Sequence, residues 1–351
     1  MEVQKPIYPL TFESVLKDYI WGGRNLEKLG KVLPPEGKVA ESWEASCHPN
    51  GLSVVADGFL KGKTLFQVIE EYGDKIVGTR FAGKKYPLLV KFIDANDRLS
   101  FQVHPDDDYA GKFENGGLGK NEMWYVVAAE PGAFLYLGLK QGITKEQFAN
   151  AIKEDRVEEC MSKLEVQAGD AVNIPAGTIH AICEGLLIIE VQQSSDLTYR
   201  VYDYSRIDSS GNTRPLHINK ALDVISFGGQ QSTKQKGIKV CFDGEGSKIV
   251  LAANKYFAAE KWDVDGMISQ EANGTNFYLY TLIDGFLDVG YDGGSISVRK
   301  GQTVFIPAAL GYYTIEGKAQ IIKSYVPDLE KDIYLPLIEK GFTREQIDEA
   351  I

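Results

Sequence analysis

Short apolar or alternating segments, each closed by glycine, proline, asparagine or aspartate, follow one another along most of this chain. Segments of this length and punctuation are typical of strands, and many of them with few intervening helices favour a sandwich, a jelly roll or a barrel. The chain is therefore predicted to be mainly β. The expected strands are residues 86–93, 99–104, 124–128, 133–137, 171–174, 186–192, 198–204, 239–242, 248–252, 277–283, 286–289, 295–298, 303–306 and 320–325.

A few helices are expected among the strands. Residues 64–72 carry apolar side chains at helical spacing, and Thr-x-x-Gln capping boxes begin at Thr144 and Thr343. In such a box the threonine hydroxyl accepts a hydrogen bond from the amide three residues on, and the glutamine reaches back to the amide of the cap. The first box predicts a helix to about residue 151, and the second predicts a helix at the C-terminus.

An internal repeat indicates two domains. Residues 169–176 (GDAVNIPA) are echoed 132 residues later at 301–308 (GQTVFIPA), and in that register Tyr312 matches His180. We favour duplication over convergence on a strand–proline–turn pattern. A polar, glycine-rich stretch at 227–234 reads as a linker, and a single core stops growing at roughly 250–300 residues. The domains expected are 1–226, 227–328 without metal ligands, and a helical tail at 329–351.

Composition and charge exclude several classes of protein. The 351 residues are 44% apolar and 25% charged, which is ordinary for a folded soluble protein and unlike collagen, coiled coils or disordered chains. A net charge of −11 disfavours nucleic-acid binding, so the cations that hold an anionic ligand must gather in a pocket. No signal peptide and no membrane-spanning run is expected, and four scattered cysteines suit a reduced, cytoplasmic protein.

Two of the four histidines, His104 and His180, lie in contexts that suggest a site. In the expected strand at 99–104, Ser100, Gln102 and His104 share the face opposite to the apolar residues. A glutamine and a histidine two residues apart on one strand face can direct one oxygen and one nitrogen at the same point. A solvent-facing strand would need neither residue type, so this pairing favours a site.

Glu122 and His180 add the remaining ligands of a candidate metal site. Glu122 shares a strand face with Lys120 and Trp124, and His180 ends a Gly-x5-Pro-x-Gly-x2-His string that begins at Gly169. Two oxygens and two nitrogens suit Zn²⁺, and could also hold Mn²⁺, Fe²⁺ or Co²⁺. With one carboxylate the site keeps a net charge near +1, which suits a hydroxyl or a developing oxyanion. The four predicted ligands are Gln102, His104, Glu122 and His180.

The string that ends at His180 resembles the second motif of the cupin superfamily. Taken with residues 99–105, 119–124 and 195–204, it closely resembles type I mannose-6-phosphate isomerases in their short bacterial form, from about residue 19 to 325. The resemblance implies paired cupin-type jelly-roll or β-barrel domains and an enzyme with one Zn²⁺ per chain that interconverts mannose 6-phosphate and fructose 6-phosphate. Gln102, His104, Glu122 and His180 match the family's zinc ligands.

Two departures from related patterns are visible. Seventeen residues separate His104 from Glu122, more than in a generic cupin, although the isomerases share this insertion. Asn121 stands where larger members often carry a histidine, which puts in doubt any mechanism that needs a histidine beside the glutamate.

Isomerisation through an enediol needs a polarised carbonyl, a stabilised enediolate and a base. The family resemblance implies that Arg200 stabilises the enediolate; the alternative is a surface residue paired with Asp196 or Asp203. Lys120, Lys91 and Asp196 all remain candidates for the base. Lys91 interrupts an apolar strand, so it lies either at the mouth of a barrel or in a pocket where burial would lower the pKa of its amine.

The phosphate group needs local positive charge in an acidic protein, and we expect Ser100 with either Lys91 or Lys120 to bind it. Trp21 is a candidate for lining the sugar site, with a core position as the alternative. His48 and His217 are interpreted as ordinary polar residues.

Other functions use the same features. An isomerase of another hexose phosphate, such as glucose 6-phosphate, would need the same site. A non-catalytic sugar-phosphate cupin would keep the metal, but the combination of Lys91, Lys120 and Arg200 exceeds what mere binding needs. A cupin dioxygenase is disfavoured because its ligands are usually histidine-rich. The sequence indicates no oligomeric state.

Overall fold

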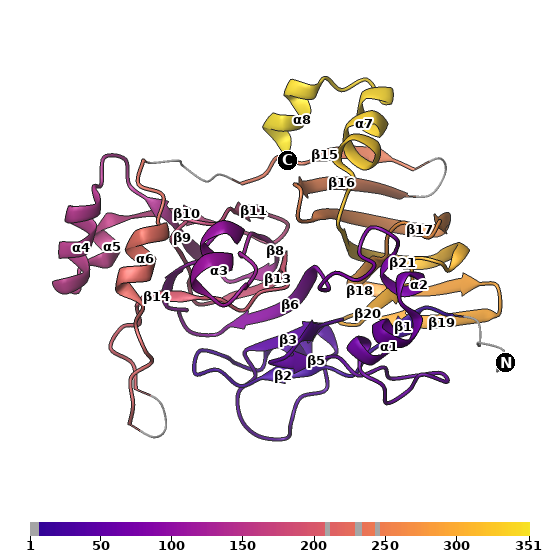
Figure 1. The fold of residues 1–351 in the computed structure, drawn as a ribbon, viewed down its shortest axis with the longest axis horizontal. Coiled ribbons are helices and arrows are strands. Elements are labelled where there is room, and N and C mark those ends of the chain that lie inside the picture. The colour runs from indigo at the N-terminus through magenta and orange to yellow at the C-terminus, as the bar shows by residue number, and fades with distance from the viewer. Residues whose placement is uncertain (1–6, 208–210, 229–233, 243–245) are drawn as a thin grey trace.

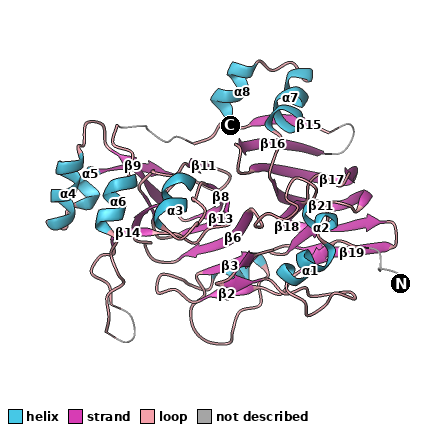
Figure 2. Ribbon diagram, in the orientation of Figure 1, coloured by secondary structure: helices cyan, strands magenta, loops and turns pink. Residues whose placement is uncertain are grey.

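Antiparallel sheets are the main regular structure of the protein, as the mainly β prediction requires (Figure 2). The computed structural model describes residues 7–207, 211–228, 234–242 and 246–351 (Figure 1). In Figure 1 two groups of strands lie side by side, with α4, α5 and α6 at the outer end of the first and α7 and α8 beside β15 and β16 of the second.

The first group of strands forms a two-sheet sandwich around a common core. Trp124 and Ile188 from one sheet pack against Leu135 and Ile182 from the other. Both sheets are open, so this group contains no closed barrel over the residues described. Two open sheets packed face to face are consistent with a jelly roll. The six-stranded sheet has the order β11 (Ala171–Ile174), β8 (Glu122–Ala129), β13 (Leu186–Gln193), β6 (Leu88–Ala95), β3 (Glu41–Glu44) and β2 (Val15–Lys17). The five-stranded sheet has the order β10 (Met161–Glu165), β9 (Phe134–Leu139), β12 (His180–Ile182), β7 (Phe101–Val103) and β14 (Tyr199–Tyr202).

The second group is an eight-stranded sheet with three long strands. The segments predicted at 277–283 and 286–289 are one strand, β18, because a bulge at Leu282 to Asp284 carries the pairing across the expected break. The N-terminal strand β1 pairs with β20, so the earliest described strand belongs to this sheet. Its strands are β1 (Leu10–Thr11), β20 (Thr303–Ile306), β18 (Tyr278–Tyr291), β21 (Gly311–Tyr325), β17 (Ala258–Ala272), β16 (Gly246–Ala253), β15 (Ile238–Cys241) and β19 (Gly294–Arg299).

Helices cover the ends of both groups. The capping boxes predicted at Thr144 and Thr343 are present, and Thr64 forms a third. None of the helices over the residues described has both the length and the apolar character that a membrane crossing requires. The helices are α1 (Leu65–Tyr72), α2 (Asp74–Val77), α3 (Asp107–Phe113), α4 (Lys145–Lys153), α5 (Val157–Cys160), α6 (Ile218–Val224), α7 (Leu335–Glu339) and α8 (Arg344–Ala350), with the short turns η1 (Asn25–Leu29) and η2 (Leu329–Tyr334); β4 (Cys47–His48) and β5 (Gly51–Leu52) form a small hairpin.

The two groups of strands share one pairing register. At three successive pairs across the six-stranded sheet, the eight-stranded sheet pairs the corresponding residues, and the series starts from the repeat found in the sequence. In the first group the opposed pairs are Val172–Trp124, Trp124–Glu190 and Glu190–Lys91; in the second they are Val304–Tyr280, Tyr280–Lys323 and Lys323–Glu260. This agreement supports the proposal that the two groups arose by duplication. Most of the predicted linker (229–233) lies outside the described residues.

The buried Glu260 makes a pH-dependent contribution to the stability of the second group. Burial alone would raise the pKa of this carboxyl, but Lys248, Lys323 and the Trp262 indole lower it from 4.5 to about 2. A depressed carboxyl pKa stabilises the fold above pH 4.5, and this contribution is lost as the pH falls toward 2. At about 1.4 kcal/mol for each pKa unit it amounts to about 3 kcal/mol at neutral pH.

We therefore expect Glu260→Gln to lower the free energy of unfolding by about 2–3 kcal/mol at pH 7. The difference from the wild type should shrink as the pH is lowered from 4.5 toward 2, because the native carboxyl is then protonated as well. Denaturant titrations at a series of pH values measure this difference. A constant difference over that range would contradict the assignment.

Candidate functional site

His104, Glu122 and His180 form a buried cluster in the first sandwich. One ligand atom from each side chain lies within 4.8 Å of the others. Their strands explain why they meet. His104 directly follows β7, Glu122 begins β8, and His180 begins β12 opposite Gln102 of β7. Three segments distant in sequence thus bring two imidazoles and one carboxylate to one point.

Backbone carbonyls orient both imidazoles. His104 Nδ1 lies 2.7 Å from the Leu197 carbonyl oxygen, and His180 Nδ1 lies 2.9 Å from that of Thr178. A Nδ1–H that donates to a carbonyl leaves the Nε2 lone pair free, and both Nε2 atoms face Glu122, at 3.4 Å from His104 and 3.7 Å from His180. Burial lowers the pKa of both imidazoles, that of His180 to about 3, so both are neutral at pH 7.

Glu122 is a buried, ionised carboxylate. Lys120 Nζ lies 2.5 Å from its Oε1, and its Oε2 accepts no hydrogen bond from any residue that the structure describes. Burial alone would raise its pKa, but Lys120 and His104 hold it well below the usual value. A buried charge is costly unless it is paired or bound to a metal. This carboxylate and the two Nε2 lone pairs together fit a divalent cation.

Gln102 is placed to act as the fourth ligand. Its amide nitrogen lies 3.3 Å from His180 Nε2. The two ends of a side-chain amide are interchangeable by a half-turn, and that rotation directs Oε1 at the same point. All four predicted ligands therefore converge.

A cavity of about 260 Å³ lies over this cluster, with Gln102 and Lys120 in its wall. Every residue that the sequence analysis assigned to catalysis or to substrate binding lines it. These residues are Trp21, Lys91, Ser100, Lys120, Asp196 and Arg200. The structure thus brings the predicted constellation together at one opening.

Lys91 is held in a buried ion network. Its Nζ lies 3.0 Å from Glu190 and 3.7 Å from Glu41, and the indoles of Trp124 and Trp43 donate to these two carboxylates. Burial alone would lower the pKa of Lys91, but Glu190 and Glu41 raise it above its usual value. The alternative of a pocket that lowers the pKa is therefore wrong, because two buried carboxylates contact this amine and no local motif indicates that contact.

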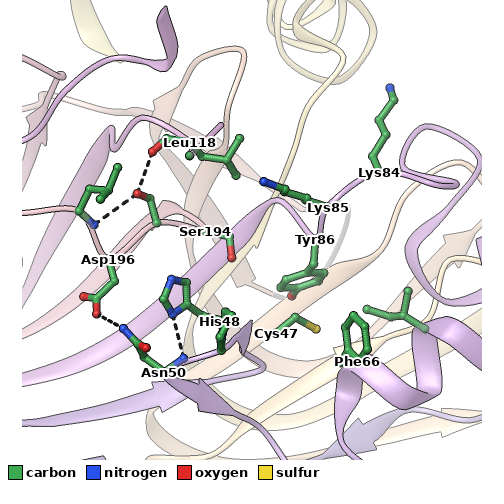
Figure 3. Close-up of a pocket in the computed structure, with 15 residues that line it drawn as sticks. Cys47, His48, Asn50, Phe66, Lys84, Lys85, Tyr86, Leu118, Ser194 and Asp196 are labelled. Atoms are coloured by element: carbon green, nitrogen blue, oxygen red, sulfur yellow. Dashed lines mark hydrogen bonds between the residues drawn. The ribbon is translucent and has the colours of Figure 1, made fainter. Parts of the chain in front are cut away.

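Lys120 and Asp196 face the cavity from different sides. Lys120 Nζ lies 2.5 Å from Glu122 Oε1 and 3.4 Å from His104 Nε2. Asp196 accepts a hydrogen bond of 2.9 Å from Asn50 and also lines a second cavity of about 520 Å³, with His48 on its wall (Figure 3). Lys120 is therefore the candidate base next to the metal cluster, and Asp196 stands at the partition between two cavities.

Comparison with known proteins decides the family. The model for the type I phosphomannose isomerase catalytic domain matches residues 10–124, and that for the mannose-6-phosphate isomerase cupin domain matches residues 247–326. The probable mannose-6-phosphate isomerase GmuF of Bacillus subtilis is 38% identical over 318 residues, which cover 91% of this chain and 99% of the relative. The chain belongs to the type I mannose-6-phosphate isomerase family. A mannose-6-phosphate isomerase of Streptococcus mutans is 36% identical over 320 residues, 90% of this chain and 98% of that protein.

Solved structures agree with this family. The mannose 6-phosphate isomerase of Bacillus subtilis superposes with a TM-score of 0.84 at 34% identity, covering 91% of this chain and 99% of that one. A structure described as a mannose 6-phosphate isomerase bound with zinc and yttrium shares the fold, with a TM-score of 0.71 at 15% identity.

In this member of the family, Arg200 is a cation without a carboxylate partner. Its Nε donates to Ser100 at 3.2 Å and its Nη1 to the Pro215 carbonyl at 3.1 Å, and no ion pair to it exists within the described segments. The alternative pairing with Asp196 or Asp203 is thus not formed. Burial, followed by the nearby Arg214, lowers the pKa of Arg200.

Several residues of this isomerase-family cavity were missed in the sequence. His217, interpreted as an ordinary polar residue, lines the cavity, and its Nδ1 accepts from the Arg200 amide at 3.3 Å. Glu190 interrupts an apolar strand just as Lys91 does, a signal that could have identified it. Other lining residues carried no such signal: Tyr19, Glu41, Thr198 and Arg214.

Proposed function

We propose that this protein is a zinc-dependent aldose–ketose isomerase that interconverts mannose 6-phosphate and fructose 6-phosphate. The observation that carries the proposal is the buried His104–Glu122–His180 cluster beneath a cavity lined by four cationic side chains. Relatives more than 30% identical over nine-tenths of the chain are named mannose-6-phosphate isomerases, which supports this substrate pair.

Gln102, His104, Glu122 and His180 would hold one Zn²⁺ per chain. The mixed nitrogen and oxygen donors and the neutral imidazoles suit this ion, and a solved relative of the same fold is described as zinc-bound. A bound divalent ion polarises a carbonyl and stabilises negative charge that develops on its oxygen.

Lys120 is proposed to carry the proton between C2 and C1. After Lys120 has released one proton to solvent, the neutral Nζ takes the proton from C2 of the open-chain aldose, the electron pair forms the C1–C2 double bond of the enediol, and the O1 oxygen gains a proton. The same amine returns its proton to C1 while the O2 hydroxyl loses one, which yields the ketose. Lys120 adjoins the cluster where both carbon atoms must lie, whereas Asp196 stands at the cavity partition as the alternative base.

Arg200 is proposed to stabilise the enediolate. It lies opposite Gln102 across the β14–β7 pair, and no carboxylate neutralises it. Ser100, which accepts from Arg200, is proposed to contact the substrate, and Trp21 to line the sugar site. Lys91 is assigned to holding Glu41 and Glu190 in the wall, since both carboxylates engage its amine.

A coupled assay of the purified protein tests the proposal. We expect turnover of mannose 6-phosphate to be lost after dialysis against a chelator and restored by Zn²⁺ in proportion to the metal bound. Parallel assays with glucose 6-phosphate and unphosphorylated mannose distinguish an isomerase of another sugar. A protein that retains Zn²⁺ and binds sugar phosphate without turnover would instead be a non-catalytic cupin, and the proposal would fail.

A further inference from the structure

Arg214 brings a guanidinium to the cavity from the segment that follows β14. Its Nε and Nη2 donate to the two carboxylate oxygens of Asp203, at 2.8 and 2.5 Å. A two-point contact of this kind fixes the plane of the guanidinium. Asp203 therefore holds one edge of the group, and Nη1 has no hydrogen-bond acceptor among the residues the structure describes.

The charges of the cavity are unevenly compensated. Lys91 faces two carboxylates, and Lys120 lies against Glu122. Around Asp203 the balance is reversed. Its carboxylate serves both Arg206 and Arg214, and the neighbouring Arg200 has no carboxylate at all. Arg206 also lies 3.5 Å from Asp97, so three guanidiniums face two carboxylates, and Arg206 does not line the cavity.

An excess of about one positive charge on the arginine side of the cavity favours the binding of a phosphate monoester, which carries about −1.5 to −2 at pH 7. This excess lies inside a chain with a net charge of −11, where the approach of an anion is otherwise disfavoured. The lysines expected to bind phosphate are both engaged by carboxylates, so the arginine side of the cavity is the better match.

The positions of these arginines suit an extended sugar phosphate. Arg200 lies opposite Gln102 of the metal cluster and donates to the carbonyl of Pro215, the residue next to Arg214. Arg200 thus stands between the cluster and Arg214. A substrate whose carbonyl end lies at the cluster would direct its phosphate end past Arg200 toward Arg214, with His217 beside them.

We infer that Arg214, oriented by Asp203, is a specificity-determining residue that binds the phosphate group of the substrate. The inference rests on the proposed isomerase function for the identity of the sugar, but not for the chemistry of the anion. It assigns to Arg214 the role that the sequence analysis gave to a lysine.

Paired variants test this inference on the zinc-loaded, full-length protein. Arg214→Gln removes the guanidinium that faces the cavity, and Arg206→Gln removes the other partner of Asp203, which does not line the cavity. For Arg214→Gln we expect KM for mannose 6-phosphate to rise about 10–100-fold, with kcat changed by less than about threefold. The Kd for inorganic phosphate, measured by calorimetry, should rise by a similar factor. Turnover of unphosphorylated mannose should be the same in Arg214→Gln as in the wild type. Arg206→Gln should leave all of these values within about twofold.

Each other outcome overturns the inference. If both variants weaken phosphate binding equally, Arg214 acts only by supporting Asp203; if phosphate binds Arg214→Gln as tightly as the wild type, the anion lies elsewhere. Arg214→Lys keeps the positive charge but not the planar two-point hydrogen bonding of the guanidinium, so it should show an intermediate Kd for phosphate. This variant also provides a test that does not depend on the folding of Arg214→Gln. Because phosphate binding is measured without turnover, a wild type that binds phosphate through Arg214 but does not isomerise mannose 6-phosphate would refute the proposed function alone.

Discussion

Replacement of Glu122 by glutamine is expected to remove bound zinc and to lower kcat/KM for mannose 6-phosphate by at least about a thousandfold. Glu122 is the only carboxylate of the candidate metal cluster over the residues described. With glutamine at position 122, the ligand set would consist of two neutral imidazoles and two neutral amides. Such a set carries no negative charge to balance the ion. Stabilisation of developing negative charge by a metal amounts to several kcal/mol, and each 1.4 kcal/mol is a factor of ten in rate.

Metal content and folding are measured separately from activity. Elemental analysis should find well under one zinc per chain in Glu122→Gln, whereas Glu122→Asp should retain part of the metal. Glu260→Gln is the matched control, because it neutralises a carboxylate that is equally buried but lies in the second sheet. Stoichiometric zinc in Glu122→Gln, or a loss of zinc in Glu260→Gln, would contradict the ligand assignment.

The sequence predicted the parts of the fold whose pattern is local. Strands such as β11 and β20 are short, apolar and closed by proline and a turn, so their bounds are reproduced. The long strand β17 was missed because Glu260, Asp263 and Asp265 interrupt its apolar positions and mimic a loop. These charged residues are compatible with a strand because Glu260 is buried and its charge is paired, whereas Asp265 is exposed to solvent.

The convergence of Gln102, His104, Glu122 and His180 could be predicted because these residues stand in specific motifs, whereas the charge balance of the cavity could not. No local pattern shows that Lys91 meets Glu190 and Glu41 or that Arg214 shares Asp203 with Arg206, because those contacts depend on the pairing of distant strands and on loop positions. The binding of phosphate by Ser100 with Lys91 or Lys120 therefore stays a prediction, and Arg214 could be considered only from the structure.

The second group of strands carries other residues at positions that correspond to the candidate metal site of the first group. Tyr278 occupies the register position of Glu122, opposite Ile306 as Glu122 is opposite Ile174. The charges of the neighbouring pair are also exchanged, with Glu260 and Lys323 where the first sheet has Lys91 and Glu190. Lys323 Nζ lies 4.4–5.8 Å from the centres of four aromatic rings, and burial lowers its pKa to about 8. In the second group a lysine and a tyrosine thus stand where the first group has Glu190 and Glu122.

Replacement of Lys120 by methionine is expected to lower kcat by about 10²–10⁴-fold while zinc remains bound, the range that a positioned general base contributes. Methionine keeps most of the length of the side chain and removes the amine that lies 2.5 Å from Glu122 and 3.4 Å from His104. Since both of these residues are ligands of the proposed metal site, retention of zinc distinguishes loss of the proton carrier from loss of the metal.

Hydrogen exchange between substrate and solvent provides the decisive measurement. In D₂O the wild type should incorporate deuterium at C2 of mannose 6-phosphate, and Lys120→Met should lose this exchange together with turnover. Lys120→Arg keeps a positive charge beside Glu122 but is too basic to accept the proton, so it should retain zinc and remain inactive. Asp196→Asn serves as the comparison, because Asp196 is held by Asn50 at the partition between the two cavities. If Asp196→Asn abolishes exchange and Lys120→Met does not, the base is Asp196, and the amine beside the metal cluster serves only to balance the charge of Glu122.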